Sequence, residues 1–213
     1  MVPKLPPFGA LRLASPRDIL RIGIVATAGF RYSPVFDWER PYHEKFPNDT
    51  ILSYRHGFAS ALKSPDSIVL VAVDKFDPEE SGKTKAIIPT DNGWEAPNAG
   101  DEVVVGVAYW KLEQGSKRID EGQDDLDLYP ELPACPDRDK HEEHYKVFGD
   151  RAEEAEHKQG VIAATMGKAL FASMGYENLE DIKIEGDEVV PQGVTVSAMV
   201  FKPDEKPDES AEL

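Results

Sequence analysis

The residues best suited to chemistry lie in one aromatic and acidic segment, at positions 30 to 58. This aromatic segment reads FRYSPVFDWERPYHEKFPNDTILSYRHGF and holds eight of the chain's nineteen aromatic residues. Glu39 and His43 are four residues apart, so a helical conformation would place both side chains on one face. A carboxylate and an imidazole placed in this way can exchange protons with a substrate. We therefore predict Glu39 and His43 as the catalytic acid and base.

The aromatic residues around this pair have two interpretations. Phe36, Trp38 and Tyr42 offer large apolar areas, and with the neighbouring carboxylates they would form a substrate pocket that orients an amine. The same residues would equally well pack as a satellite core between two helices. The spacing alone does not choose between a substrate-binding and a packing role.

Other motifs exclude several kinds of site. The chain contains neither Gly-x-Gly-x-x-Gly nor Gly-x-x-x-x-Gly-Lys-Ser/Thr, so dinucleotide and P-loop sites have no support. His141 and His144 are three residues apart, whereas the zinc metalloprotease motif separates its histidines by four. Cys135 lies between two prolines with no base beside it in the sequence. We predict no metal site and no thiol nucleophile.

The composition indicates an acidic protein that binds neither nucleic acid nor membrane. Among 213 residues, 24 are Lys or Arg and 40 are Asp or Glu, which gives a formal net charge of −16. This charge repels a phosphate backbone, whose affinity for proteins comes largely from Lys and Arg. The apolar runs are far shorter than the roughly 18 residues that cross a membrane. A single cysteine suits a reducing compartment, and we predict a cytoplasmic location.

The hydrophobic periodicity predicts an α/β (α+β) fold with a mixed sheet. Ser15 and Pro16 suit the N-cap and first turn of the first helix. One residue of Asn48–Thr50 is expected to cap the second helix, and Gly175 to end the third. The expected strands are Ala10–Leu13, Ser67–Val73, Val103–Lys111, Gly160–Ala164 and Thr195–Phe201, and the expected helices are Arg17–Phe30, Ile51–Leu62 and Met166–Met174.

Acidic residues gather in three parts of the chain that we expect to lack regular structure. Asp74–Asp101 and Glu113–His144 combine prolines, glycines and clustered acids, and are predicted to be long loops. Lys202–Leu213 has no large apolar residue before its last position and is predicted to be disordered. The sequence thus predicts one domain over residues 1–201, followed by an acidic tail over 202–213.

The order of these elements resembles the GNAT superfamily of acyl-CoA-dependent N-acyltransferases. Four stretches are similar to the family's first strand and helix, its second and third strands, and a late strand with the helix after it: LRLASPRDILRIGIVATAGF, SIVLVAVD, VVVGVAYWKLE and GVIAATMGKALFASMGY. The segment SPVFDWERPYHEKFP is similar to the connection between the first two helices in a subgroup of the family. The resemblance implies a GNAT-like mixed, mostly antiparallel sheet flanked by helices, with acetyl-CoA as co-substrate.

One part of the family pattern is missing from this chain. In GNAT proteins a loop of the type Gln/Arg-x-x-Gly-x-Gly/Ala, at the start of a helix after the fourth strand, binds the cofactor's pyrophosphate through backbone N–H groups. The chain has no Gly-x-Gly between 147 and 160. The resemblance also places Ala164 where the family has an asparagine, and Phe171 where it has a tyrosine that protonates the leaving thiolate. The predicted domain is therefore short of a segment between 147 and 160.

The missing segment has a structural consequence. Without a fourth strand, Val103–Lys111 loses its antiparallel neighbour, because unpaired strand edges need another partner or cover. We expect either a rearranged sheet in which Gly160–Ala164 docks beside it, or a sequence from which a segment has been omitted. Both alternatives stay open.

Under the resemblance, the residues predicted to bind acetyl-CoA are Thr165, Gly167 and Lys168. They begin a helix, and the first backbone N–H groups of a helix together with a nearby cation suit an anion. The alternative is that these residues only begin the helix.

Three functions remain open from the sequence. The first is transfer of an acetyl group from acetyl-CoA to an amine, either a small amine or a basic peptide that an acidic surface attracts. The second is a non-catalytic family member that binds a small ligand or a protein partner. The third is a hydrolase or lyase that uses Glu39 and His43, although no nucleophile motif supports it. No oligomeric state is predicted.

Overall fold

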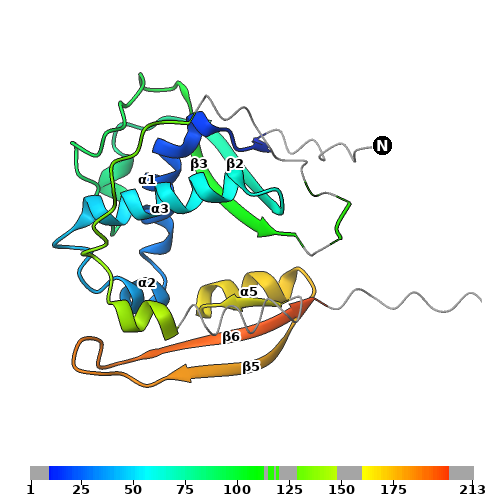
Figure 1. Cartoon of the computed structure of the whole chain (residues 1–213). Coiled ribbons are helices and arrows are strands. Elements are labelled where there is room, and N and C mark those ends of the chain that lie inside the picture. Colours follow the sequence, from blue (N-terminus) through cyan, green and yellow to red (C-terminus); the bar gives the residue numbers. More distant parts are fainter. Residues whose placement is uncertain (1–9, 113–114, 118, 120–128, 148–159, 202–213) are drawn as a thin grey trace, which may run out of the picture. The chain divides into compact units, whose positions relative to one another are not determined.

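The computed structural model describes residues 10–112, 115–117, 119, 129–147 and 160–201. Within the chain two compact units form, and each is described by itself (Figure 1). The predicted tail at 202–213, and all but the ends of the segment between 147 and 160, lie outside the described residues. The units comprise Met1–Tyr32 with Tyr42–Asp139, and Ser33–Pro41 with Lys140–Leu213. The single domain expected over 1–201 stays a prediction.

The first unit is a three-stranded antiparallel sheet with helices on one face. Its strands run in the order β1-β2-β3, and all neighbours are antiparallel. The helices α1 and α3 pack against each other, α1 on β3 and α3 on β2 (Figure 1). The elements are β1 (Leu11–Leu13), η1 (Pro16–Asp18), α1 (Ile19–Phe30), α3 (Pro47–Lys63), β2 (Ser67–Lys75), η2 (Glu80–Lys83) and β3 (Glu102–Lys111).

The core of this unit lies between the helices and the sheet. Ile19 and Ile22 of α1 and Val71 of β2 are completely buried in one apolar cluster. Full burial of an aliphatic side chain of this size stabilises a fold by roughly 1.5 to 3 kcal/mol. The apolar faces of α1 and β2 therefore pack together in one layer, as the helical period of α1 and the apolar run of β2 predict.

The two helices approach closely at Gly23. A Cβ atom there would lie 2.6 Å from Cγ of Arg55 and 2.8 Å from the carbonyl oxygen of Ile51, both on α3. Arg55 extends over α1, and its Nε and Nη2 donate hydrogen bonds to the carbonyl oxygen of Leu20 at 3.0 and 2.8 Å. Gly23 is thus required by the helix crossing.

The starts of the helices confirm one capping prediction and correct another. Ser15 precedes η1, Pro16 occupies its first turn, and the Ser15 N–H donates to the Asp18 carboxylate at 2.7 Å. The second helix begins at Pro47, so the prediction of a cap within Asn48–Thr50 is wrong. Proline is favoured at the first helical position, which moves the start upstream.

Strand β3 carries a bulge and an open edge. The register with β2 shifts between Ala72 and Val73, which leaves Val105 without a directly opposed residue. Among the described residues β3 pairs with β2 alone, so its other edge has no neighbouring strand. The expectation that Gly160–Ala164 docks beside Val103–Lys111 is wrong, because Gly160–Ala163 pairs with residues 197–200 in a separate sheet.

The second unit is a separate three-stranded antiparallel sheet, ordered β4-β6-β5. Helix α5 packs on β5 and β6, and the short helix α2 packs on β6 (Figure 1). Trp38 of α2 is buried against Val190, Val194 and Val196. The elements are α2 (Pro34–Glu39), β4 (Gly160–Ala163), α5 (Thr165–Ser173), β5 (Tyr176–Ile184) and β6 (Val194–Phe201).

The mixed α/β architecture of antiparallel sheets with flanking helices confirms the predicted fold class. Helix α5 ends where expected, before Gly175, whose φ of 91° suits glycine. The elements α2, β5 and η2 were not predicted, and residues 142–147 are helical although Glu113–His144 was predicted to be a loop. Between 76 and 101 the chain contains only η2 and irregular structure, as expected of a loop. No helix in the described residues is long and apolar enough to cross a membrane.

Candidate functional site

The structure divides the predicted acid/base pair. Helix α2 ends at Glu39, because Arg40 leaves the helical region with φ −127° and ψ 55°. Glu39 belongs to the second unit, whereas His43 lies in a turn of the first unit. The condition for a shared face, a helix that runs through both residues, is therefore not met.

His43 is held in a buried chain of hydrogen bonds. Its Nε2 accepts from the Ile87 N–H at 3.2 Å, so in the neutral ring Nδ1 carries the proton. Nδ1 lies 2.9 Å from Oγ1 of Thr50, which donates in turn to Asp139 at 2.7 Å. The His43 ring is only 2% exposed. Both ring nitrogens are thus used inside the fold, which indicates a structural role for His43.

Glu39 retains the properties of an acid/base group. Burial raises the pKa of its carboxyl to about 7, against the opposing attraction of Arg40 and Lys140. A pKa near neutrality suits a general base, since the group can take and release protons at cellular pH. The Glu39 carbonyl oxygen also accepts a hydrogen bond from His141 at 3.0 Å.

The three residues of the predicted aromatic pocket differ in their surroundings. Phe36 and Trp38 are 2% and 3% exposed, so both are buried. Trp38 belongs to the core of the second unit, and its ring stacks on His144 with centroids 3.8 Å apart. Tyr42 is 38% exposed and lies in the first unit. For Trp38 the structure supports the packing interpretation.

The two histidines of the HEEH sequence also serve packing and hydrogen bonding. Nδ1 of His144 lies 2.8 Å from the carbonyl oxygen of Trp38, and Nε2 lies 2.6 Å from the Asp187 carboxylate. The ring centroids of His141 and His144 are 3.9 Å apart, with the two rings tilted by 35°. In the part of the chain that the structure describes, no group of three metal-ligating side chains is present.

The predicted cofactor residues lie at the start of α5. Helix α5 begins at Thr165 with Ala164 as its N-cap, a residue that makes no side-chain capping hydrogen bond. A Cβ added to Gly167 would meet Ala163 and Phe171 only at 3.6 Å, so the space around it does not require glycine. Nζ of Lys168 lies 2.7 Å from Oδ1 of Asp181.

Asp181 already holds this lysine within a network. It accepts from Lys168 and from Ser197 Oγ at 2.6 Å, and these contacts lower the pKa of its carboxyl to about 2. Lys168 would have to leave Asp181 to contact an anion. The described geometry therefore offers the backbone of the first turn of α5, rather than a spare cation, for anion binding.

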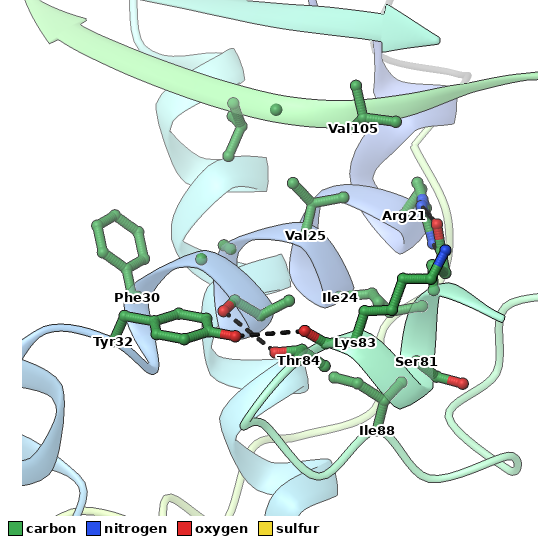
Figure 2. A pocket seen from close by; sticks show the side chains of 16 residues that line it. Arg21, Ile24, Val25, Phe30, Tyr32, Ser81, Lys83, Thr84, Ile88 and Val105 are labelled. Atoms are coloured by element: carbon green, nitrogen blue, oxygen red, sulfur yellow. Dashed lines mark hydrogen bonds and ion pairs between the residues drawn. The ribbon is translucent and has the colours of Figure 1, made fainter. Parts of the chain in front are cut away.

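A separate pocket of about 530 Å³ lies in the first unit, between α1, η2 and β3. Figure 2 shows Val25 of α1 below Val105 of β3, with Phe30 and Tyr32 at one end and Arg21 at the other. Most of the lining is apolar. The lining residues are Arg21, Ile24, Val25, Ala26, Ala28, Gly29, Phe30, Tyr32, Glu80, Ser81, Lys83, Thr84, Ile88, Val105, Gly106 and Val107.

The polar groups of this pocket are engaged with one another. Arg21 is 6% exposed and forms a two-pronged ion pair with Glu80, in which Nη2 and Oε2 are 2.7 Å apart. Its guanidinium also lies 4.6 Å from the ring centroid of Trp94. The Tyr32 hydroxyl donates to the Lys83 carbonyl oxygen at 3.3 Å. Such a pocket can bind an apolar or aromatic group, and the contacts described for its lining residues include no pair of nucleophile and base.

Sequence reasoning missed most of this pocket. Phe30 and Tyr32 belong to the aromatic segment, so that cluster did signal part of the lining. Arg21 gave a weaker signal, as a charged residue one position before the buried Ile22. Its partner Glu80 lies 59 residues away in an acidic loop, and no local pattern predicts that pairing.

Comparison with known proteins supports the resemblance drawn from the sequence. No protein-family model matches the chain. A protein named Acetyltransferase from Stachybotrys chartarum is 25% identical over 240 residues, which cover 94% of each chain. A solved structure of a histone acetyltransferase HPA2 and related acetyltransferase from Corynebacterium glutamicum is 15% identical, covers 92% of this chain and 98% of that chain, and has a TM-score of 0.35. The chain is thus similar to an acetyltransferase over nearly its whole length.

The match also has a gap in this chain. It runs over 240 positions, whereas 94% of 213 residues is only about 200. About 40 positions therefore have a residue in the relative and none here. A deficit of this size is large enough for a strand and a helix, which typically need about 6 and 12 residues.

Proposed function

We propose that this protein is a GNAT-like N-acetyltransferase that transfers an acetyl group from acetyl-CoA to an amine. The similarity to an acetyltransferase over 94% of both chains is the observation that carries the proposal. The antiparallel sheets with helices on their faces agree with it. The carboxyl group of Glu39, with its pKa raised to about 7, supplies a base suited to the reaction.

In the proposed reaction Glu39 takes a proton from the amine, directly or through a water molecule. The amine nitrogen then attacks the thioester carbonyl, a C–N bond forms, and the C–S bond breaks as the thiolate leaves. A proton from solvent neutralises the thiolate, because the phenylalanine at 171 cannot donate one. His43 is proposed only to hold Thr50 and the backbone around it.

Acetyl-CoA would bind at the start of α5. The backbone N–H groups of Thr165 and Gly167 lie in the first turn, where a helix attracts negative charge. Lys168 would contribute after exchanging Asp181 for a phosphate group. Bound acetyl-CoA supplies the activated acyl group, and the chain supplies its position and the base.

The acceptor is proposed to be a small amine or a basic peptide. A net charge of −16 attracts cations and raises their encounter rate, and it disfavours nucleic acid. The acceptor-binding residues predicted from the sequence are Phe36, Trp38 and Tyr42, and of these only Tyr42 is exposed. We place the reaction in the cytoplasm.

The test is acetyl transfer from radiolabelled acetyl-CoA to a panel of polyamines and basic peptides. Glu39→Gln should lower kcat at least about a hundredfold, as loss of a general base typically does, with a smaller change in KM. Asp37→Asn on the same helix is the matched control and should leave kcat near the parent value. If calorimetry detects no acetyl-CoA binding at millimolar concentration, the proposed acetyltransferase activity is refuted.

A non-catalytic binding protein is the second candidate, and specific observations favour it. Lys168 is already paired with Asp181, and both ring nitrogens of His43 are hydrogen-bonded inside the fold. Sequencing transcripts across residues 147–160 separates the two candidates. An additional segment with a strand and a Gly-x-Gly loop would favour the enzyme, and the present junction in every transcript would favour the binding protein.

A further inference from the structure

The backbone on both sides of Glu39 is held by the segment that contains His141 and His144. The carbonyl oxygen of Glu39 accepts from the His141 N–H at 3.0 Å, and the carbonyl oxygen of Trp38 lies 2.8 Å from Nδ1 of His144. These carbonyl groups belong to the two peptide bonds that flank the Cα atom of Glu39. They lie at the end of α2, where carbonyls have no partner within the helix. His141 and His144 therefore fix the backbone from which the Glu39 side chain extends.

His144 can make its two hydrogen bonds at once only when both ring nitrogens carry a proton. A carbonyl oxygen accepts and never donates, so Nδ1 must donate to Trp38. Nε2 lies 2.6 Å from the Asp187 carboxylate. Hydrogen bonds from Val190, His144 and Val189 lower the pKa of this carboxyl to about 2, so it is ionised and also only accepts. A neutral imidazole would lose one of the two bonds.

The surroundings of the His144 ring favour a positive charge. His144 is 4% exposed, and its ring stacks on the indole of Trp38 with an angle of 13° between the planes. The face of an indole attracts a cation, and so does the C-terminal end of a helix. The charged and titratable groups on the segments that contact the ring are Asp37, Glu39 and Arg40 at α2, Lys140, His141, Glu142 and Glu143 beside it, and Asp187 and Glu188 on the turn. Acidic residues predominate in this set, which also favours a cation.

We propose that His144, in its doubly protonated form, is a positioning residue that holds Glu39 in place through the carbonyl end of α2. This role rests on the proposed function, since Glu39 is a base only if acetyl transfer occurs. Helix α2 has six residues, and so short a helix depends on partners outside it. Loss of the His144 side chain should let the Glu39 carboxyl reach water. Its pKa, which burial raises to about 7, should then fall toward 4.5.

Nitrogen NMR of the isotope-labelled parent protein tests the proton count on His144 directly. Near neutral pH both ring nitrogens should give the chemical shift of an N–H group. Asp187→Asn is the matched variant, because an amide can accept from the Val189 and Val190 N–H groups through its oxygen and donate to Nε2 through its nitrogen. This variant should show one protonated and one bare ring nitrogen. A bare ring nitrogen in the parent protein overturns the proposal.

Carbon NMR of the Glu39 carboxyl measures the positioning without any assay of activity. His144→Gln removes the charge and cannot reach both partners as the ring does, so it should lower the Glu39 pKa by at least about one unit. Glu143→Gln, on the exposed side of the same helix, is the control and should leave this pKa at about 7. Asp187→Asn should leave it near the parent value too, since both bonds can form with a neutral ring. An unchanged Glu39 pKa in a folded His144→Gln variant overturns the proposal.

Acetyl transfer gives the catalytic readout. His144→Gln should lower kcat at least about tenfold and move the acid limb of the pH profile of kcat to lower pH, with little change in KM for acetyl-CoA. If the parent protein transfers no acetyl group, the proposed function fails, and the two NMR measurements still decide whether His144 holds Glu39. Transfer by the parent protein with the same kcat and pH profile in a folded His144→Gln variant overturns the positioning role.

Discussion

Glu39 is the residue at which the sequence-based hypothesis gains physical support. The spacing to His43 suggested an acid/base pair, but the helix ends between them and each residue has its own surroundings. Sequence patterns identified a carboxylate among aromatic residues. They could not predict the burial that raises its pKa to about 7, because burial depends on residues far away in the sequence.

The raised pKa of Glu39 predicts a dependence of stability on pH. The folded state binds one more proton than the unfolded state between pH 4.5 and about 7, so the free energy of unfolding falls as pH rises through this window. The change amounts to at most about 3 kcal/mol. Glu39→Gln is neutral at every pH, and it should be more stable than the parent at pH 8 and nearly equal at pH 4. Urea unfolding at both pH values measures the free energy of unfolding. An equal change between pH 4 and pH 8 in the variant and the parent would contradict the prediction.

Among the elements, helices α1 and α3 and strands β2 and β3 were predicted from the sequence because their periodicity reflects burial on one side or on both. Strand β5 was missed, since Glu177, Glu180 and Asp181 interrupt its apolar pattern and most of it is exposed. Helix α2 was missed because six residues are too few to show a helical period. Short elements such as α2 and weakly buried ones such as β5 thus leave weak sequence patterns.

The crossing of α1 and α3 gives a prediction for this pair of elements. Gly23→Ala should destabilise the fold by about 1 to 3 kcal/mol, because the added methyl group meets Arg55 and the backbone of α3. Gly29→Ala on the same helix is the control, since a Cβ there meets nothing within 4 Å. The control should be neutral or more stable by up to about 1 kcal/mol. Denaturant unfolding of both variants measures the difference in their free energies of unfolding. An equal effect of the two substitutions would contradict the close approach of α1 and α3 at Gly23.

For the whole molecule, the predicted fold class is confirmed, whereas the division into two units was not foreseen. The division into two units is consistent with the shortage of residues between 147 and 160. The sequence showed the shortage as a missing Gly-x-Gly. It could not show that Ser33–Pro41 would join the C-terminal unit, because only the contacts of Trp38 with β6 reveal this.

The net charge predicts how the whole molecule responds to salt. With 40 acidic and 24 basic side chains, mutual repulsion opposes the compact state, and salt screens it. Raising NaCl from about 20 mM to about 0.3 M should therefore raise the thermal midpoint, with the Debye length falling well below the size of the protein. Scanning calorimetry at neutral pH measures this. A midpoint that falls with salt would show that specific ion pairs outweigh the net repulsion.

The way the chain passes between the two units has a consequence for biosynthesis. Trp38 leaves the ribosome early, but Val190, Val194 and Val196, which bury it, are synthesised about 150 residues later. At roughly 5 to 20 residues per second this delay lasts about 8 to 30 s. During that time the indole of Trp38 lacks the valine side chains that bury it in the folded protein.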